Sequence, residues 1–465
     1  MGSKSKAALL MLLAVLGIAA GGGTAHADGA PSGTDVQVAQ TLGARELTVI
    51  IRRVDTTPSP LRVDVVTHRG SPPGTLHVAV AADGITSART DVVLGAEPGV
   101  YAGNLRVDKP GPWTLSLSDG TGPAATIPFV VPARVVPPWE KATYGGFVAA
   151  GAFLLLALVV GVRAKRTAYA LIPAGGVVAA IAVAVTGALL SASTPPPPAP
   201  GSRLDPTFDN VTDPYANAQL STVDYSRPPV NLAVEAARDE LKLRLTDGAT
   251  GRPVDDLLVH DNALVHLVLI SPSGRLSHLH PVRVGPGDYR VRVADPEAGT
   301  YAVAAELARR GGGVQLVRST VDLKGTASSA PEPPGPGPRT VDGTSVELTV
   351  SQGTPTTITA RFPAQDLQPW LGMLGHLIIT GPFTGAAGEG AAKAPTWAHV
   401  HAMIPPVAGQ ADRPDETVAA YGPDVSFTYT FAAPGRYRIW LQAERGYRVL
   451  TVPAVVDVPT TGAGR

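Results

Sequence analysis

Two long apolar segments lie in the first half of the chain, and they constrain its fold more than any other feature. Residues 144–162 (YGGFVAAGAFLLLALVVGV) and 169–191 (YALIPAGGVVAAIAVAVTGALLS) contain no charged side chain and are long enough to cross a bilayer as helices. The short segment between them, 163–168, carries Arg163, Lys165 and Arg166. Because basic loops are retained in the cytoplasm, we expect a two-pass transmembrane hairpin with a cytoplasmic loop.

The N-terminal residues 1–27 have the features of a signal peptide. Lys4 and Lys6 precede the apolar run AALLMLLAVLGIAA, and small residues provide a cleavage site after Ala27. Cleavage after Ala25 would instead leave His26 at the mature N-terminus. Together with the hairpin, the signal peptide predicts a cell-membrane protein with its N- and C-terminal domains on the extracytoplasmic side.

Charge and composition narrow the possible functions. The chain has 38 basic and 38 acidic residues, which argues against a nucleic-acid-binding surface. It has no cysteine, so any metal site must use His, Met, Asp or Glu side chains. It also lacks the nucleophile elbow, the phosphate-binding loop and the His-Glu-x-x-His motif, so we do not expect an enzyme.

The rest of the chain has the pattern of a mainly β protein. Proline-rich linkers at 193–204 and 327–340 separate three units, at 28–137, 205–326 and 341–460. Each unit has alternating apolar runs bounded by Gly, Pro and Asp, and a glycine turn followed by an aromatic strand recurs near the end of each. The pattern predicts three immunoglobulin-like antiparallel β-sandwich domains in addition to the two-helix transmembrane hairpin.

Histidines cluster in the second unit. The runs LVHLVLI (264–270) and RLSHLHPV (275–282) flank the turn residues SPSG, which favour a three-residue loop ending at Gly274. In that register His266 lies opposite His280, with His278 as its diagonal neighbour, so all three imidazoles share one face. A four-residue loop would instead put His266 on the opposite face.

This face allows two interpretations. Three neutral imidazoles suit Zn²⁺ or Cu²⁺, with His260 or Asp261 as a fourth or orienting group. Alternatively the face is the sandwich core, because it also carries Leu264, Val268 and Ile270, and the histidines are bonded to backbone or to one another. A metal ion is favoured because each neutral ring has one donor and one acceptor to satisfy.

The third unit repeats the pattern. His376 in GHLIITG accompanies His399 and His401 in WAHVHAM, and Met403 continues the same alternation. A thioether ligand favours copper over zinc. The long connection between the two runs leaves the register open, and Met403 alone is more simply a core side chain. The first unit has His68 and His77 but no His-x-His, so we expect these two to be incidental.

The second and third units resemble YtkA-like and related heavy-metal-associated β-sandwich domains of bacterial extracytoplasmic proteins. The resemblance covers about residues 230–325 and 344–458, and it rests on TGRPVDDLLVHDNALVHLVLISPSGRLSHLHPV and on DLQPWLGMLGHLIITG followed by WAHVHAM. It implies association with copper or other heavy metals rather than a defined reaction. The third unit departs from the pattern with Ala402 where proline is usual, and with a longer hairpin.

Two functions follow. The first is a membrane-anchored extracytoplasmic metal-binding protein, for copper with zinc as the alternative ion, that captures, buffers or hands on ions to a membrane metal transporter or oxidase. The second is a cell-surface structural or interaction protein whose histidines are buried and structural. An open imidazole cluster without protein hydrogen-bond partners would favour the first. The hairpin has no ionisable residue within its spans, so it offers no ion path of its own.

Overall fold

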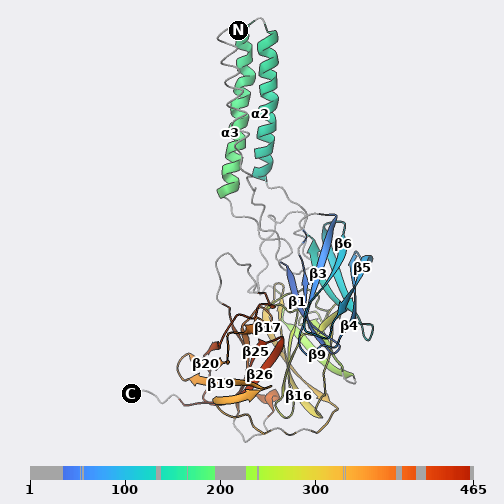
Figure 1. Cartoon of the computed structure of the whole chain (residues 1–465), viewed down its shortest axis with the longest axis vertical. Helices are drawn as coiled ribbons and strands as arrows, with labels where there is room; N and C mark the ends of the chain where they lie inside the picture. Colours follow the sequence, from blue (N-terminus) through green and yellow to red (C-terminus); the bar gives the residue numbers. More distant parts are fainter. Residues whose placement is uncertain are drawn as a thin grey trace. The chain divides into compact units, whose positions relative to one another are not determined.

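The computed structural model describes residues 35–52, 54, 57–131, 138–164, 166–193, 227–237, 240–327, 329, 331–383, 390–404 and 415–460. The expected signal peptide and most of the first proline-rich linker lie outside these residues. The chain forms two compact units, one containing the two described α-helices and the other the described strands (Figure 1). Its mainly β fold with two apolar helices confirms the predicted fold class.

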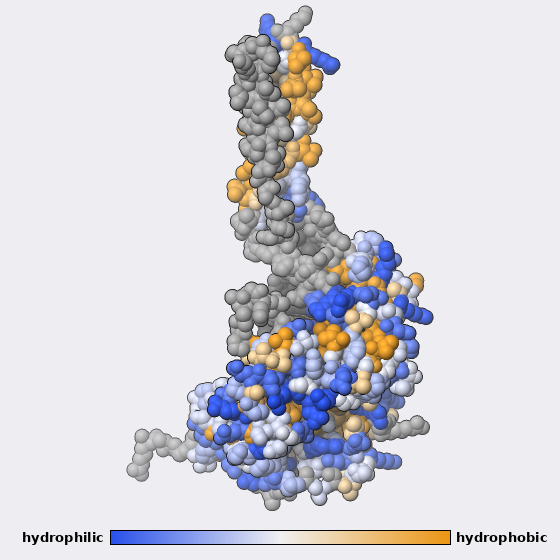
Figure 2. Space-filling view, viewed as in Figure 1, coloured by the Kyte–Doolittle hydropathy of each residue, from blue (hydrophilic) through white to orange (hydrophobic). Residues whose placement is uncertain are grey.

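The helical unit is a hairpin of α2 (Pro138–Arg163) and α3 (Leu171–Ser193), joined through the short 3₁₀ helix η1 (Thr167–Ala170). Both long helices have the length and apolar composition needed to cross a membrane, and Figure 2 shows hydrophobic side chains along the uncovered part of the hairpin. Small residues bring the helices together, because a Cβ atom on Gly146 would lie 2.7 Å from the backbone nitrogen of Ala184.

The first β-domain pairs two four-stranded antiparallel sheets. One sheet has the order β1 (Val36–Leu42), β2 (Arg45–Ile51), β3 (Ser59–Thr67) and β6 (Gly99–Val107). The other has the order β5 (Ile85–Leu94), β4 (Gly74–Ala82), β7 (Gly111–Ser118) and β8 (Ala125–Val131). Inward-facing side chains of both sheets form its core.

The second β-domain has one four-stranded and one five-stranded sheet. The smaller sheet has the order β14 (Val282–Gly285), β15 (Asp288–Arg292), β10 (Glu240–Asp247) and β9 (Val230–Ala237). The larger has the order β11 (Leu257–Leu258), β16 (Gly299–Arg309), β12 (His266–Ile270) and β13 (Leu276–Leu279), with β17 (Gly313–Leu323) paired to β16.

The third β-domain repeats the strand order of the larger sheet, whereas its smaller sheet has an additional strand at the other edge, β18, and no counterpart of β14. Its smaller sheet has the order β18 (Gly337–Val341), β19 (Thr344–Ser351), β20 (Thr356–Arg361) and β24 (Asp424–Tyr429). Its larger sheet has the order β21 (Leu367–Gln368), β25 (Gly435–Arg445), β22 (Gly375–Phe383) and β23 (Thr396–Ala402), with β26 (Arg448–Val458) paired to β25. A second 3₁₀ helix, η2 (Ala391–Lys393), precedes β23.

The recurring aromatic residues each bond the backbone of the residue four positions earlier. Trp113 Nε1 donates to the carbonyl of Lys109 at 3.0 Å, and the Tyr437 hydroxyl donates to that of Ala433 at 2.8 Å. In the second domain the Tyr301 hydroxyl accepts from the backbone N–H of Glu297 at 2.7 Å. Each aromatic side chain thus buries its ring and fixes the turn four residues before it, as a tyrosine corner does.

Successive side chains along a strand of the larger sheets point to opposite faces, so each sheet has two separate apolar faces. Leu267 and Leu269 on β12 face the interior of the second sandwich, whereas Val268 and Ile270 face outward. The outward residues form one buried cluster with Ile378 and Trp440 of the third domain. The two larger sheets therefore pack against each other through their outer faces, and the histidines lie on these faces.

Candidate metal centre

The hairpin of the second domain has the predicted register. Ser271 N–H donates to the carbonyl of Arg275 at 2.9 Å, and Gly274 adopts a φ of 87°, which closes the three-residue loop. Leu267 pairs with Leu279 and Val268 with His278. His266 and His278 thus lie on one face, and His280 follows directly after β13 in the position opposite His266.

The third domain has the same register despite its longer hairpin. His376 pairs directly with His401, and Ile378 pairs with His399. Each larger sheet therefore presents one histidine from its central strand and two from a His-x-His on the edge strand. We call His266, His278 and His280 the first half-site, and His376, His399 and His401 the second half-site.

The two half-sites meet in one buried cluster. The His278 ring lies 5.5 Å from that of His376 and 5.1 Å from that of His399, and the His266 and His399 rings are 5.6 Å apart. His266, His280 and His376 are at most 1% exposed. The histidines lie on outer faces that domain packing buries, rather than inside either sandwich. They are nevertheless buried and bonded to protein groups, as the interpretation of structural histidines predicts, and the cluster is not the open, partnerless one that would by itself favour metal.

In the first half-site one ring nitrogen of each histidine is occupied by a protein acceptor. His266 Nε2 donates to the carbonyl of His260 at 3.0 Å, and His278 Nδ1 donates to Gln442 Oε1 at 3.0 Å. His280 Nδ1 donates to Glu46 Oε1 at 2.5 Å. In a neutral imidazole the other nitrogen then carries a lone pair. These lone pairs belong to His266 Nδ1 and His278 Nε2, which lie 3.3 Å apart, and to the buried His280 Nε2, which has no hydrogen-bond partner among the described residues.

The second half-site has the same arrangement. His376 Nε2 donates to the carbonyl of Trp370 at 3.1 Å, and His399 Nδ1 donates to Glu306 Oε2 at 3.1 Å. His401 Nδ1 lies 3.3 Å from Asp261 Oδ2. The remaining nitrogens converge, with His399 Nε2 lying 3.2 Å from His376 Nδ1 and 3.3 Å from His401 Nε2. Lone pairs at such distances repel unless a cation lies between them.

The nitrogens are close enough to share ions. The ligand atoms of His266, His278 and His280 all lie within 4.8 Å of one another, and so do those of His278, His376 and His399. Outer hydrogen bonds that fix the tautomer and aim the free nitrogen inward are the arrangement seen around metal-binding histidines. The cluster therefore presents aligned imidazole donors for a transition-metal ion.

Electrostatics favour the neutral form of four of these rings. Burial, followed by neighbouring imidazoles, holds the pKa of His266, His278 and His376 well below its ordinary value, and lowers that of His401 to about 4. Burial alone would raise the pKa of Glu306, but its hydrogen bonds with His260 and His399 outweigh this and hold it well below the usual range. Imidazole nitrogens that resist protonation, beside an ionised carboxylate, favour the binding of a metal cation over that of a proton.

A smaller group lies at the rim of the cluster. His260 Nε2 lies 3.1 Å from Asp261 Oδ2 and 3.6 Å from Glu306 Oε1, and these three side chains are 12–21% exposed. Their ligand atoms also lie within 4.8 Å of one another. His260 and Asp261 thus lie beside the histidines, as expected, and Asp261 contacts both His260 of its own domain and His401 of the third.

Met403 differs from its predicted position. Strand β23 ends at Ala402, so the alternation does not continue, and the Met403 side chain is 67% exposed. It does not lie among the buried histidines, and the argument for copper based on a thioether loses its support.

Sequence reasoning missed the acceptors that orient the rings. Glu306 is the one acidic residue in the apolar strand segment YAVAAELA, and Gln442 occupies a similar position in IWLQA. A lone polar side chain in a strand of buried apolar residues requires a buried partner, and that is the signal that could have found them.

His68 was expected to be incidental, and this expectation is wrong. It is 4% exposed, and its Nδ1 lies 2.6 Å from Glu444 Oε1 of the third domain. Burial alone would lower the pKa of His68, but the Glu444 carboxylate outweighs it and raises the pKa to about 9. His77 is exposed and paired with Asp91 at the surface.

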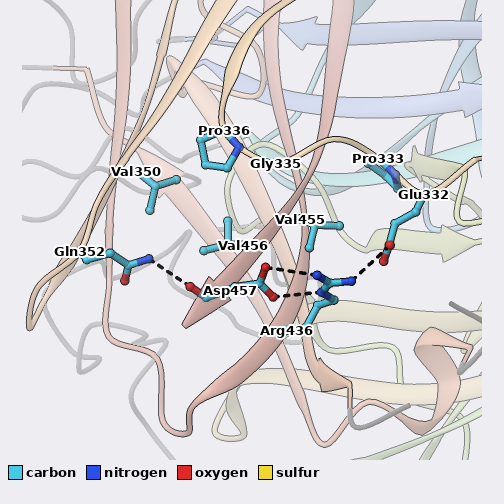
Figure 3. Close-up of a pocket in the computed structure, with 10 residues that line it drawn as sticks. All are labelled: Glu332, Pro333, Gly335, Pro336, Val350, Gln352, Arg436, Val455, Val456 and Asp457. Atoms are coloured by element: carbon cyan, nitrogen blue, oxygen red, sulfur yellow. Dashed lines mark hydrogen bonds and ion pairs between the residues drawn. The ribbon is translucent and has the colours of Figure 1, made fainter. Parts of the chain in front are cut away.

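The third domain also has a surface pocket, formed by β25, β26 and the segment before β18 (Figure 3). Its charged groups are Arg436, Asp457 and Glu332, and the Arg436 guanidinium bonds Asp457 at 2.9 Å and Glu332 at 3.4 Å. The positive charge is thus already neutralised by protein carboxylates, and the pocket presents no free group comparable to the histidine nitrogens.

Comparisons with known proteins add little on function. Residues 339–460 match the model of a domain of unknown function (DUF8832), and no curated protein matches the sequence. The family carries no functional description, so the resemblance to YtkA-like domains stays a prediction.

Among solved structures, the chain is similar to a tetra-tandem repeat in the extending region of a large adhesion protein, with 12% identity, coverage of 91% of this chain and 74% of that chain, and a TM-score of 0.15. It is also similar to a bacterial ice-binding adhesin, with 8% identity, coverage of 86% and 90%, and a TM-score of 0.14. The human OSCAR ligand-binding domain matches with 14% identity, coverage of 50% and 99%, and a TM-score of 0.13. Similarities at this level assign no function to the chain.

Proposed function

We propose that this protein is a membrane-anchored extracytoplasmic metal-binding protein, with Cu²⁺ as the preferred ion and Zn²⁺ as the next. The observation that carries the proposal is the clustering of imidazole nitrogens, because His399 Nε2 lies 3.2 Å from His376 Nδ1 and 3.3 Å from His401 Nε2, and the outer nitrogen of each of these rings faces a protein acceptor. An all-imidazole donor set binds Cu²⁺ most tightly among the divalent first-row ions.

The proposed role is to capture or buffer the ion outside the membrane and to hand it on. The two apolar helices supply the anchor, and Arg163 and Arg166 in the connection support a cytoplasmic loop with the β-domains outside. An anchored binding protein keeps its ion at a high effective concentration near a membrane transporter or oxidase. These two classes are the partners we propose.

The test is metal binding by the full chain in detergent micelles. Copper and zinc affinities are measured by competition with a chromophoric chelator, for the native chain and for a His278→Gln/His399→Gln double variant. His77→Gln is the matched control, because His77 is exposed and distant in sequence from both half-sites. We expect tight binding by the native chain and the control, and its loss in the double variant.

A second candidate function is a cell-surface interaction protein whose histidines only hold the domains together. It is favoured by two side-chain contacts that join domains, the hydrogen bond of His280 Nδ1 with Glu46 Oε1 and the buried ion pair of His68 with Glu444. Under this alternative a folded native chain binds neither ion, and the double variant is only less stable. That outcome would overturn the metal-binding proposal.

A further inference from the structure

The two half-sites are related by an internal repeat of sequence and bonding. Leu257 and Leu367 begin equivalent short strands, and the turn bridged between His260 and Ala263 corresponds to that between Trp370 and Met373. A constant offset of 110 residues therefore relates His266 to His376. Both rings donate through Nε2 to the carbonyl six residues earlier, at 3.0 and 3.1 Å.

The orienting acceptors are exchanged between the domains. Glu306 of β16 pairs with His266 in its own sheet but accepts the hydrogen bond of His399. Gln442 of β25 pairs with His376 in its own sheet but accepts the hydrogen bond of His278. Each half-site is thus completed by the opposite domain, and neither has its full arrangement without the other.

The number of imidazole ligands indicates how many metal ions the cluster can bind. Tetrahedral Zn²⁺ and tetragonal Cu²⁺ sites use three or four protein nitrogens, so six converging imidazoles exceed the need of one ion. Two sets of three imidazoles match two ions, each with a position left for water or an exchanging ligand. The sets adjoin, because His278 belongs to the first and its ligand atom lies within 4.8 Å of those of His376 and His399.

Nearby carboxylates compensate most of the charge of two such ions. Two divalent ions in a buried site need nearby anions, because an uncompensated buried charge is costly. Three carboxylates contact the outer nitrogens of the cluster: Glu46 at His280, Glu306 at His399 and Asp261 at His401. They come from the first and second domains, so all three β-domains contribute ligands or orienting groups.

We propose that the two half-sites hold two Cu²⁺ ions side by side, as a dinuclear centre across the interface between the second and third β-domains. This inference rests on the proposed function, and it adds the stoichiometry, the adjacency of the ions and the dependence of each half-site on the other domain. Binding of the pair joins the two domains, so an isolated domain lacks the complete site.

The experiment combines copper counting with electron paramagnetic resonance on the full chain in detergent micelles, titrated with Cu²⁺ and freed of weakly bound ions by dialysis. We expect two ions per chain and a half-field transition, which appears only when two Cu²⁺ spins interact at short distance. His280→Gln in the first half-site and His401→Gln in the second should each retain one ion, with the spectrum of an isolated Cu²⁺. His77→Gln should behave like the native chain.

The outcomes separate this inference from the proposed function. One ion per native chain, or two ions with isolated spectra, would overturn the dinuclear centre and leave metal binding intact. No bound copper would overturn both. If His280→Gln fails to fold because its bond with Glu46 is lost, the native spectrum and His401→Gln still decide, since His401 is partly exposed.

Discussion

The imidazole of His278 in the second β-domain is bonded to the side-chain amide of Gln442 in the third, with 3.0 Å between Nδ1 and Oε1. Gln442 Nε2 in turn donates to Thr451 Oγ1 at 2.9 Å, which leaves its carbonyl free to accept. The bond fixes the tautomer of His278, because Nδ1 must carry the proton that it donates. Gln442 is not itself a strong metal ligand, but it thereby leaves His278 Nε2 with a lone pair directed at the cluster.

Replacing this acceptor should weaken metal binding. Gln442→Leu keeps the size of the side chain but removes the carbonyl, and loss of an orienting partner typically costs 10–100-fold in affinity, so a weakening of roughly that size is expected. Chelator competition measures it. Gln352→Leu is the control, because Gln352 bonds the backbone of Asp457 at the surface. Equal affinity in both variants would show that Gln442 does not orient the ring.

Domain packing should matter as much as the ligands. Trp440 is 1% exposed, packs between the second and third domains, and donates through Nε1 to the carbonyl of Gly274 at 3.1 Å. We expect Trp440→Ala to lower the free energy of unfolding by about 3–5 kcal/mol and also to weaken copper binding.

The control for this variant is Trp113→Ala. Trp113 is 2% exposed in the core of the first domain, so its truncation should cost a similar amount of stability. Denaturant unfolding and metal titration are measured on both variants. Copper affinity should fall only in Trp440→Ala, and native-like affinity there would mean that each domain forms its half-site alone.

Met403 should not contribute to the site. Its side chain is 67% exposed beyond the end of β23, so Met403→Leu is expected to leave the affinity for Cu²⁺ and for Cu⁺ unchanged within error. Chelator competition under oxidising and reducing conditions checks both ions. A selective loss of Cu⁺ affinity would restore the thioether as a ligand.

The buried pair of His68 and Glu444 predicts a pH dependence of stability. The pKa of His68 is raised to about 9 in the folded chain, so its contribution is complete below its ordinary pKa of 6.5 and is lost as the pH rises through 9. Between these values the difference in unfolding free energy between the native chain and His68→Gln should shrink by about 1.4 kcal/mol per pH unit.

Calorimetric melting of the metal-free chain between pH 6 and 10 measures this difference, with the exposed His77→Gln as control. A difference that stays constant over the window would mean that His68 is neutral in the folded chain. His68 itself contacts Thr48 and Glu444 rather than a histidine of either half-site.

Sequence alone predicted the parts of the site that depend on local chemistry. The turn SPSG set the register of His266 against the His-x-His run, because Gly274 can adopt the positive φ that closes a three-residue loop. Turn chemistry could not predict the register around His376, because a longer connection joins the two strands there. The structure nevertheless pairs His376 directly with His401. Met403 was misplaced because alternation was extended past the end of a strand.

The chain's amino-acid pattern determined its two apolar helices, its three β-domains and the shared face of each histidine set, since these depend on hydropathy, turn residues and the two-residue period of a strand. Only the tertiary structure decided that the two faces pack on each other and merge two predicted sites into one cluster. It also decided that Glu306, Gln442 and Glu46 orient histidines of other domains. The physical reason is that contacts between distant strands follow from the shape and burial of whole domains, which no local pattern encodes.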